Sequence, residues 1–381
     1  MRPLINVSPL KKQAIVGTFW TVGSFGFGHI LRFVSNLILT RLLFPELFGM
    51  MALVNVFIMG LALFSDIGIG PSIIRHERGD EPNFLNTAWT IQVLRGFVIW
   101  GGTLVIAYPI SLLYNYPEML WLIPIVGLTS VISGFASTSL ITLNRSMDLK
   151  QLALFELVCQ VVSLLLTIVW AWLTPSIWAL VGSTIVSSVI RTLGSFLLKP
   201  QTQNRFAWDK DAIQEILHFG KWIFLSSSLT FLSMQIDRLI LGRTFSLELF
   251  GVFTIAYALS EIPRQVIGVV GDKILFPAAS RLAHLPRPEF SKRLLRNRKW
   301  LLAIMAIGIA LLACFGDLMI RLLYDQRYAQ AAWMFPLLTL GIWPTALGHT
   351  LDTSLFAIGK IQSLTVGHVM RIVFNGVGIL F

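Results

Sequence analysis

The chain has 381 residues, of which 55% are hydrophobic and only 13% carry a charge. Soluble domains average about 25% charged residues, and together with a mean hydropathy of +0.74 this composition excludes an ordinary soluble globular protein. The net charge of +11 comes from an asymmetry between loops, described below, and gives no argument for nucleic-acid binding.

Apolar runs of helix length follow one another from Ala14 to the end of the chain. Each is long enough to cross the hydrocarbon core of a bilayer as a helix. The first half holds six predicted spans, at Ala14–Leu39, Leu47–Ile69, Phe84–Ile110, Met119–Leu143, Leu152–Leu173 and Ile177–Leu198. After a polar linker come five more, at Ile216–Leu241, Leu249–Val270, Trp300–Leu323, Ala329–Ala357 and Ile361–Phe381.

These spans predict an all-α polytopic membrane protein built from two lobes. Residues 1–198 form an N-terminal six-helix lobe, Lys199–Glu215 a cytoplasmic linker, and residues 216–381 a C-terminal lobe. The last predicted helix ends at Phe381 with no polar flank, so we expect the second lobe to be incomplete.

A motif that links two predicted helices occurs twice. The segment Arg41–Gly49 returns as Arg243–Gly251, 202 positions later, and both copies end in Glu-Leu-Phe-Gly. A second pair of segments, each Leu-Leu-Tyr followed by a Trp and a Pro, recurs at a similar offset near Tyr114 and Tyr324. This order of markers indicates a duplicated membrane module, and many transporters are built from internal repeats with a substrate site at the repeat interface.

Basic residues are distributed unevenly between the two sides of the predicted bundle. Twenty-one lie on the side of the amino terminus and four on the opposite side. Cytoplasmic loops carry the excess of Lys and Arg, so we expect the amino terminus, the Lys199–Glu215 linker and the Arg264–Lys299 loop to be cytoplasmic. Six crossings return the chain to that side, which predicts two parallel lobes related by an axis along the membrane normal. The residues expected to face outward are Glu46, Asn115, Glu248 and Asp325.

Several predicted helices carry one polar stripe, with residues three and four positions apart on the same face. The first, fifth, seventh and eleventh helices have the stripes Thr21/Ser24/Gly28/Arg32/Ser35, Glu156/Gln160/Ser163/Thr167, Ser226/Thr230/Ser233/Asp237 and His368/Arg371/Asn375. We expect the stripes of the first and seventh helices to face each other across a cavity. For the small and hydroxyl residues, packing between membrane helices is the alternative role.

Ionised side chains within the spans are the candidate site residues. A central Arg costs about 2.5–3.5 kcal/mol on insertion scales, so Arg95 and Arg371, near the middle of their helices, should face water or an anion. Arg32 is a third candidate, although it is shallower and could partly snorkel. Asp66 and Glu156 are either ion-pair partners of these residues or protonatable carboxylates that couple transport to an ion gradient.

The sequence contains no recognisable catalytic constellation, neither paired carboxylates in a loop nor a His/Cys cluster with metal-ligand spacing. Cys159 and Cys314 both lie inside apolar runs, which argues against a disulfide framework or metal cluster. We therefore predict a protein that is not an enzyme and that carries no cofactor or metal.

Four segments resemble the polysaccharide-exporter branch of the multidrug/oligosaccharidyl-lipid/polysaccharide transporter superfamily. They are Asp237–Gly242, Glu248–Tyr257, Phe276–Arg281 and Leu85–Trp89. The resemblance implies six plus six helices or more around a central cavity, of which this sequence lacks the twelfth. It also implies a flippase that moves undecaprenyl-diphosphate-linked oligosaccharide across the bacterial inner membrane for the biosynthesis of O-antigen, capsule or exopolysaccharide.

Under this interpretation Arg32, Arg95 and Arg371 bind the diphosphate, because guanidinium groups suit phosphate oxygens. The expected partners are the lipid-linked oligosaccharide, membrane lipids and the polysaccharide polymerase machinery; we expect no nucleic acid and a monomer. A drug or cation antiporter of the same superfamily is the alternative, but its cavity should be dominated by acids and aromatics. A channel or scaffold without alternating access fits the duplication less well.

Overall fold

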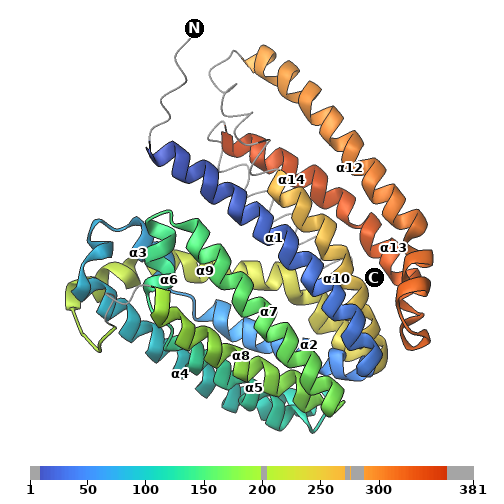
Figure 1. The fold of residues 1–381 in the computed structure, drawn as a ribbon, viewed down its shortest axis with the longest axis horizontal. Coiled ribbons are helices and arrows are strands. Elements are labelled where there is room, and N and C mark those ends of the chain that lie inside the picture. Colours follow the sequence, from blue (N-terminus) through green and yellow to red (C-terminus); the bar gives the residue numbers. More distant parts are fainter. Residues whose placement is uncertain (1–8, 199–203, 271–274, 276–286, 358–381) are drawn as a thin grey trace. The chain divides into compact units, whose positions relative to one another are not determined.

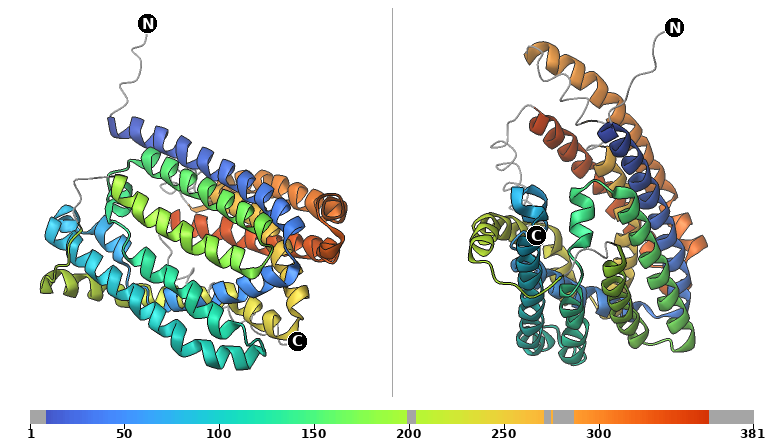
Figure 2. Two further views of the ribbon diagram at one scale, coloured as in Figure 1. Left: turned by 60° about the horizontal axis from the view of Figure 1, so that its bottom comes forward. Right: turned by 60° about the vertical axis from the view of Figure 1, so that its left-hand side comes forward.

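The computed structural model describes residues 9–198, 204–270, 275 and 287–357, and within them every regular element is a helix (Figures 1 and 2). The chain divides into two compact units, which do not coincide with a single cut in the sequence. The first contains Met1–Leu43 and Met50–Arg243, and the second contains Phe44–Gly49 and Thr244–Phe381. The predicted eleventh helix, Ile361–Phe381, lies outside the described residues.

The first unit contains long helices and three short helical segments. In chain order they are α1 (Pro9–Leu42), α2 (Pro45–Phe64, whose first turn belongs to the second unit), α3 (Ile69–Arg75), η1 (Glu77–Asp80), α4 (Pro82–Tyr114), α5 (Met119–Gly134), α6 (Ser139–Arg145), α7 (Leu149–Leu173), α8 (Ile177–Leu198) and α9 (Lys210–Thr244). Helix α8 has the bounds that hydropathy predicts. Helix α9 begins at Lys210, so it includes the last six residues of the predicted linker.

Small residues let the helices of this unit approach closely. Helix α4 lies along α5, and α7 lies beside both α1 and α8 (Figures 1 and 2). A Cβ on Gly96 of α4 would lie 2.6 Å from the carbonyl oxygen of Ser130, and one on Gly134 of α5 would lie 3.2 Å from that of Gln92. Helices in a membrane associate through this kind of backbone approach.

Two spans that hydropathy predicts as continuous are broken in this unit. Helix α2 ends at Phe64, before Ile69, because Gly68 adopts a left-handed conformation with φ of 67°. The predicted helix Met119–Leu143 is the pair α5 and α6, bent by 59°. Ser195 of α8 accepts two hydrogen bonds from residues at this bend. Its Oγ accepts from the backbone N–H of Ser137 at 2.8 Å, and its carbonyl oxygen accepts from Ser139 Oγ at 2.6 Å.

The second unit, described by itself, contains α10 (Leu247–Val270), α12 (Arg287–Leu323), η3 (Gln326–Tyr328), α13 (Ala331–Leu340) and α14 (Ile342–Ala357). Ile267, Ile309, Ile342 and Ala346 form a core between α10, α12 and α14. The predicted span Ala329–Ala357 is broken at Gly341, just before Pro344, whose missing N–H disfavours a continuous helix.

The protein is a multi-span membrane protein. Among the described residues, six stretches are long and apolar enough to cross a bilayer, or seven if α5 and α6 form one span. Helices α1, α9 and α10, predicted as spans, are not among them. Each of these three helices carries polar groups within the predicted span, for example Arg32, Asp237 and Glu261.

A network of ion pairs joins the start of α9 to the segment between α3 and α4. Arg78 of η1 contacts Glu81 at 2.8 Å, Asp209 at 3.1 Å and Glu215 at 3.8 Å. Asp209 also accepts hydrogen bonds from the backbone N–H groups of Asp211 and Ala212. The N–H of Ala212 and the nearby Arg78 guanidinium hold the pKa of Asp209 below its ordinary value of 3.8.

This network predicts an acid-sensitive contribution to stability. Because its pKa is lower in the folded protein, ionised Asp209 stabilises the fold fully above pH 3.8, and that contribution is lost as pH falls through the lower, folded pKa. Thermal unfolding of the detergent-solubilised protein, measured from pH 7 to pH 3, should show a smaller loss on acidification for Asp209→Asn than for the wild type. The exposed neighbour Asp211→Asn is the control; equal curves for Asp209→Asn and the wild type would contradict the assignment.

Candidate substrate-binding cavities

Two adjoining cavities lie within the first unit. The first, of about 390 Å³, is lined by the end of α2, the start of α3, and α4, α5, α6 and α8. The second, of about 520 Å³, is lined by α1, α5, α7 and α8. They share three lining residues, Thr129, Ser133 and Arg191, so the two cavities meet at these side chains.

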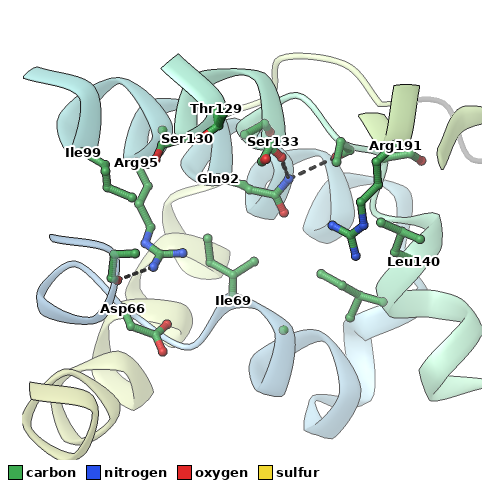
Figure 3. A pocket seen from close by; sticks show the side chains of 17 residues that line it. Asp66, Ile69, Gln92, Arg95, Ile99, Thr129, Ser130, Ser133, Leu140 and Arg191 are labelled. Carbon is green, nitrogen blue, oxygen red and sulfur yellow. Dashed lines mark hydrogen bonds between the residues drawn. The ribbon is translucent and has the colours of Figure 1, made fainter. Parts of the chain in front are cut away.

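Arg95 lines the first cavity from α4, and its guanidinium group is already engaged. Nε donates to the carbonyl of Ser65 at 2.9 Å, and Nη2 donates to the carbonyl of Ala62 at 2.6 Å. The last carbonyls of a helix have no partner within it, and a cation there also complements the helix dipole. Arg95 therefore caps the carboxyl end of α2. Figure 3 shows Arg95 and Arg191 entering the cavity from different helices.

Two neighbours on the same face of α4 make similar contacts at the α5–α6 break. Nε2 of Gln92 donates to the carbonyls of Gly134 at 2.9 Å and Ala136 at 3.1 Å. Nε1 of Trp89 donates to the carbonyl of Phe135 at 3.3 Å. One helix thus supplies the donors that satisfy both interrupted helices beside the cavity.

Asp66 also lines the first cavity, and both of its carboxylate oxygens have partners. Oδ1 accepts from the backbone N–H of Gly68 at 3.0 Å, and Oδ2 accepts from Ser227 Oγ of α9 at 3.1 Å. The first contact stabilises the turn between α2 and α3. These contacts are hydrogen bonds and not the ion pair that was one of the two predicted roles of Asp66, so the choice between ion pairing and ion coupling stays a prediction.

The second cavity has a mainly polar wall that includes Arg32, Glu156 and Gln160. Two residues of the predicted stripes contact each other here, since Gln160 Nε2 of α7 donates to the carbonyl oxygen of Gly28 of α1 at 2.7 Å. A Cβ added to Gly28 would lie 2.9 Å from Gln160 Oε1. Ser163 Oγ accepts from Ser187 Oγ at 2.9 Å. For these stripe residues the observed role is contact between α1, α7 and α8. Arg32 is exposed on the cavity wall.

Arg191 is the residue that sequence reasoning missed. The count of basic residues on the two sides of the predicted bundle assigns Arg191 to a loop. In the structure Arg191 lies inside α8 and lines both cavities. Its Nη2 pairs with Glu156 Oε1 at 2.5 Å, and both side chains stay nearly half exposed, at 44% and 46%. The signal was present in the sequence, because Thr184, Ser187 and Arg191 are three and four residues apart on one face of α8.

The remaining predicted residues fall elsewhere. Arg371, with His368 and Asn375, lies outside the described residues, as does the side chain of Thr21. The predicted pairing of the first and seventh helical stripes stays a prediction. Among the described residues, no group of three or more His, Cys, Asp or Glu side chains could hold a metal ion.

Comparisons with known proteins agree with this architecture. Residues 38–333 match the family model described as polysaccharide biosynthesis protein. The chain is 23% identical over 326 residues to the succinoglycan biosynthesis transport protein ExoT of Rhizobium meliloti (strain 1021), covering 83% of this chain and 65% of that one. It is 23% identical over 278 residues to the lipopolysaccharide biosynthesis protein WzxC of Escherichia coli (strain K12), covering 72% and 56%. The chain thus spans less than two thirds of the length of these relatives.

Solved structures show the same fold. The lipid II flippase MurJ in an inward closed conformation superposes with a TM-score of 0.71 at 13% identity, covering 94% of this chain and 80% of that one. An inward-facing multidrug resistance MATE family transporter of the MOP superfamily superposes with a TM-score of 0.62 at 15% identity, covering 90% and 83%. The predicted all-α, two-lobed transporter fold and the predicted resemblance are confirmed, and the chain belongs to the polysaccharide biosynthesis protein family.

Proposed function

We propose that the protein flips undecaprenyl-diphosphate-linked oligosaccharide from the cytoplasmic to the periplasmic leaflet of the bacterial inner membrane. Its family and the names of its relatives support a role in polysaccharide export. The observation that carries the proposal furthest is Arg191, a half-exposed guanidinium on the wall shared by two cavities inside a membrane fold.

The chemistry of such a substrate fits these cavities. A diphosphate cannot enter hydrocarbon without a polar path, and Arg offers a planar, permanently charged fork for its oxygens. Sugars instead need many neutral hydrogen-bonding groups, which Thr129, Ser133 and the hydroxyls of α8 supply. We assign the diphosphate to Arg191 and Arg32, with Arg95 stabilising the wall of the first cavity, and Arg371 stays a predicted contributor.

A drug or cation antiporter of the same superfamily is the competing function. It would need free acidic groups to bind a cation, whereas Asp66 is hydrogen-bonded on both oxygens and Glu156 is paired with Arg191. These contacts favour an anionic substrate. The predicted inner-membrane location, the cytoplasmic amino terminus, the monomeric state and the polymerase partners belong to the same proposal.

The experiment that tests the substrate class is a native mass spectrum of the full-length protein purified from its own membrane in mild detergent. A bound lipid whose fragments include polyprenyl diphosphate and hexose supports the proposal. Addition of that lipid should raise the thermal midpoint of the protein, since a ligand that binds only the folded state stabilises it. A rise with hydrophobic cations and none with lipid-linked sugar would instead establish the antiporter.

A further inference from the structure

The first cavity carries little unbalanced charge on its inner wall. Arg95 and Asp66 line it near the end of α2, and their formal charges cancel. Both side chains are already hydrogen-bonded by the fold. The third charged residue of this wall, Arg191, lies where the cavity meets the second one and pairs with Glu156. A ligand group inside the first cavity therefore meets mainly neutral side chains.

Gln92 of α4 presents its amide oxygen to this cavity. Its Nε2 donates to the carbonyls of Gly134 and Ala136, and because a carbonyl can only accept a hydrogen bond, the orientation of the amide is fixed. Oε1 forms no hydrogen bond with the described residues. In Figure 3 this oxygen is turned away from the bonded carbonyls. The cavity thus contains a fixed acceptor, which a ligand can satisfy only with an O–H or N–H group.

Two hydroxyl groups of α5 extend this polar surface. Thr129 Oγ1 donates its proton to the carbonyl of Val126 at 2.7 Å, so toward the cavity it can only accept. Ser130 also lines the cavity, and its hydroxyl has no hydrogen-bond partner in the part of the chain that the structure describes. Apolar atoms of Ile69 and Leu140 line the same space. A sugar ring has this combination of properties, with hydroxyl groups at its edge and C–H groups on its faces.

We propose that the first cavity is the subsite for the sugar next to the diphosphate, and that it selects a neutral sugar over an acidic one. This inference rests on the proposed function. Gln92 and Ser130 determine the specificity, because they exchange hydrogen bonds with hydroxyl or acetamido N–H groups. A uronic acid would bring a carboxylate, which can only accept, against the Gln92 oxygen and the Asp66 carboxylate, and an acceptor left unpaired in this way is costly. The diphosphate stays at Arg191, where the two cavities meet.

The test is a thermal-shift titration of the full-length protein in detergent with three probes. They are polyprenyl diphosphate, the same lipid bearing glucose, and the same lipid bearing glucuronic acid. A ligand that binds only the folded state raises the thermal midpoint according to its affinity. We expect glucose to lower the Kd at least fivefold relative to the bare lipid, and glucuronic acid to give no such gain. Equal Kd values for the bare and the glucose-bearing lipid, or for the two sugar-bearing lipids, would overturn the proposal.

Ser130→Ala localises the effect, because it removes a hydroxyl without a partner in the described fold and should leave folding unchanged. It should weaken binding of the glucose-bearing lipid at least threefold and leave binding of the bare lipid unchanged. Ser183→Ala is the matched control. Ser183 is a buried residue of α8 that lines neither cavity and donates to the carbonyl of Leu180 in its own helix. This variant should leave all three Kd values unchanged.

The outcomes separate the sugar subsite from the proposed function. Arg191→Ala should weaken binding of the bare and the sugar-bearing lipids alike, since all of them carry the diphosphate. Equal losses for the bare and the glucose-bearing lipid in Ser130→Ala would overturn the sugar subsite alone. A wild-type protein whose thermal midpoint responds to none of the three probes would overturn the proposed function and the subsite with it.

Discussion

Arg95→Ala is expected to destabilise the protein markedly, by about 1.5–3 kcal/mol, the value of one charge-assisted hydrogen bond whose loss leaves a carbonyl unpaired. At the end of α2 the carbonyl of Ser65 would lose its donor, whereas that of Ala62 would keep the weaker bond from Ser65 Oγ at 3.1 Å. Thermal unfolding in detergent and the amount of protein in the membrane measure the effect. Arg95→Lys should recover only part of the stability, since an ammonium group cannot reproduce the forked geometry.

The control for this prediction is Val98→Ala, one turn further along α4, where the side chain is 66% exposed. It shortens a side chain on the same helix without removing a hydrogen bond, and it should leave stability nearly unchanged. Normal protein levels and a normal melting temperature in Arg95→Ala, with export abolished, would contradict the capping role and return Arg95 to direct substrate binding.

The positions of the helices follow closely from the sequence, because burial in a bilayer imposes a simple requirement of length and hydropathy. Helix α8 runs from Ile177 to Leu198 as predicted, and α7 and α10 differ from prediction by a few residues at their starts. The breaks within the predicted spans did not follow from the sequence. The α5–α6 bend depends on bonds to Ser195, which lies more than fifty residues away in the chain.

The candidate site shows the same limit. Depth along the helix indicated that Arg95 needs polar surroundings, and the structure supplies them as the carbonyls at the end of α2, which no pattern in α4 itself could reveal. Arg191 was missed for a different reason. It lies only seven residues before the end of α8, so a count of basic residues near helix ends assigns it to a loop, although the hydroxyl stripe that precedes it marks a cavity wall.

The second large effect is expected for Arg191→Ala, which should lower export tenfold to hundredfold with little change in the amount of protein. Loss of a charge-assisted contact to phosphate of about 1.5–3 kcal/mol corresponds to that range. The half-exposed pair with Glu156 contributes only about 0–1 kcal/mol to stability, so folding should tolerate its loss. Export by cells that depend on the full-length protein, normalised to protein level, measures the effect.

Glu156 separates a binding role for Arg191 from a structural one. In the proposed mechanism Glu156 competes with the substrate for the guanidinium group, so Glu156→Gln should keep export and tighten binding of a polyprenyl diphosphate several-fold in a thermal-shift titration. The double variant should behave like Arg191→Ala. If the pair were only structural, both single variants would lose export together, and the double variant would lose no more than either.

A second ion pair provides the matched control. Arg293 and Glu289 of α12 also lie 2.5 Å apart and are 53% and 47% exposed, but they line neither of the two cavities. Arg293→Ala removes the same kind of contact and should leave export within about twofold of the wild type, since exposed ion pairs contribute little. An equal loss of export in Arg293→Ala and Arg191→Ala would show a general dependence on surface charge and remove Arg191 from the substrate site.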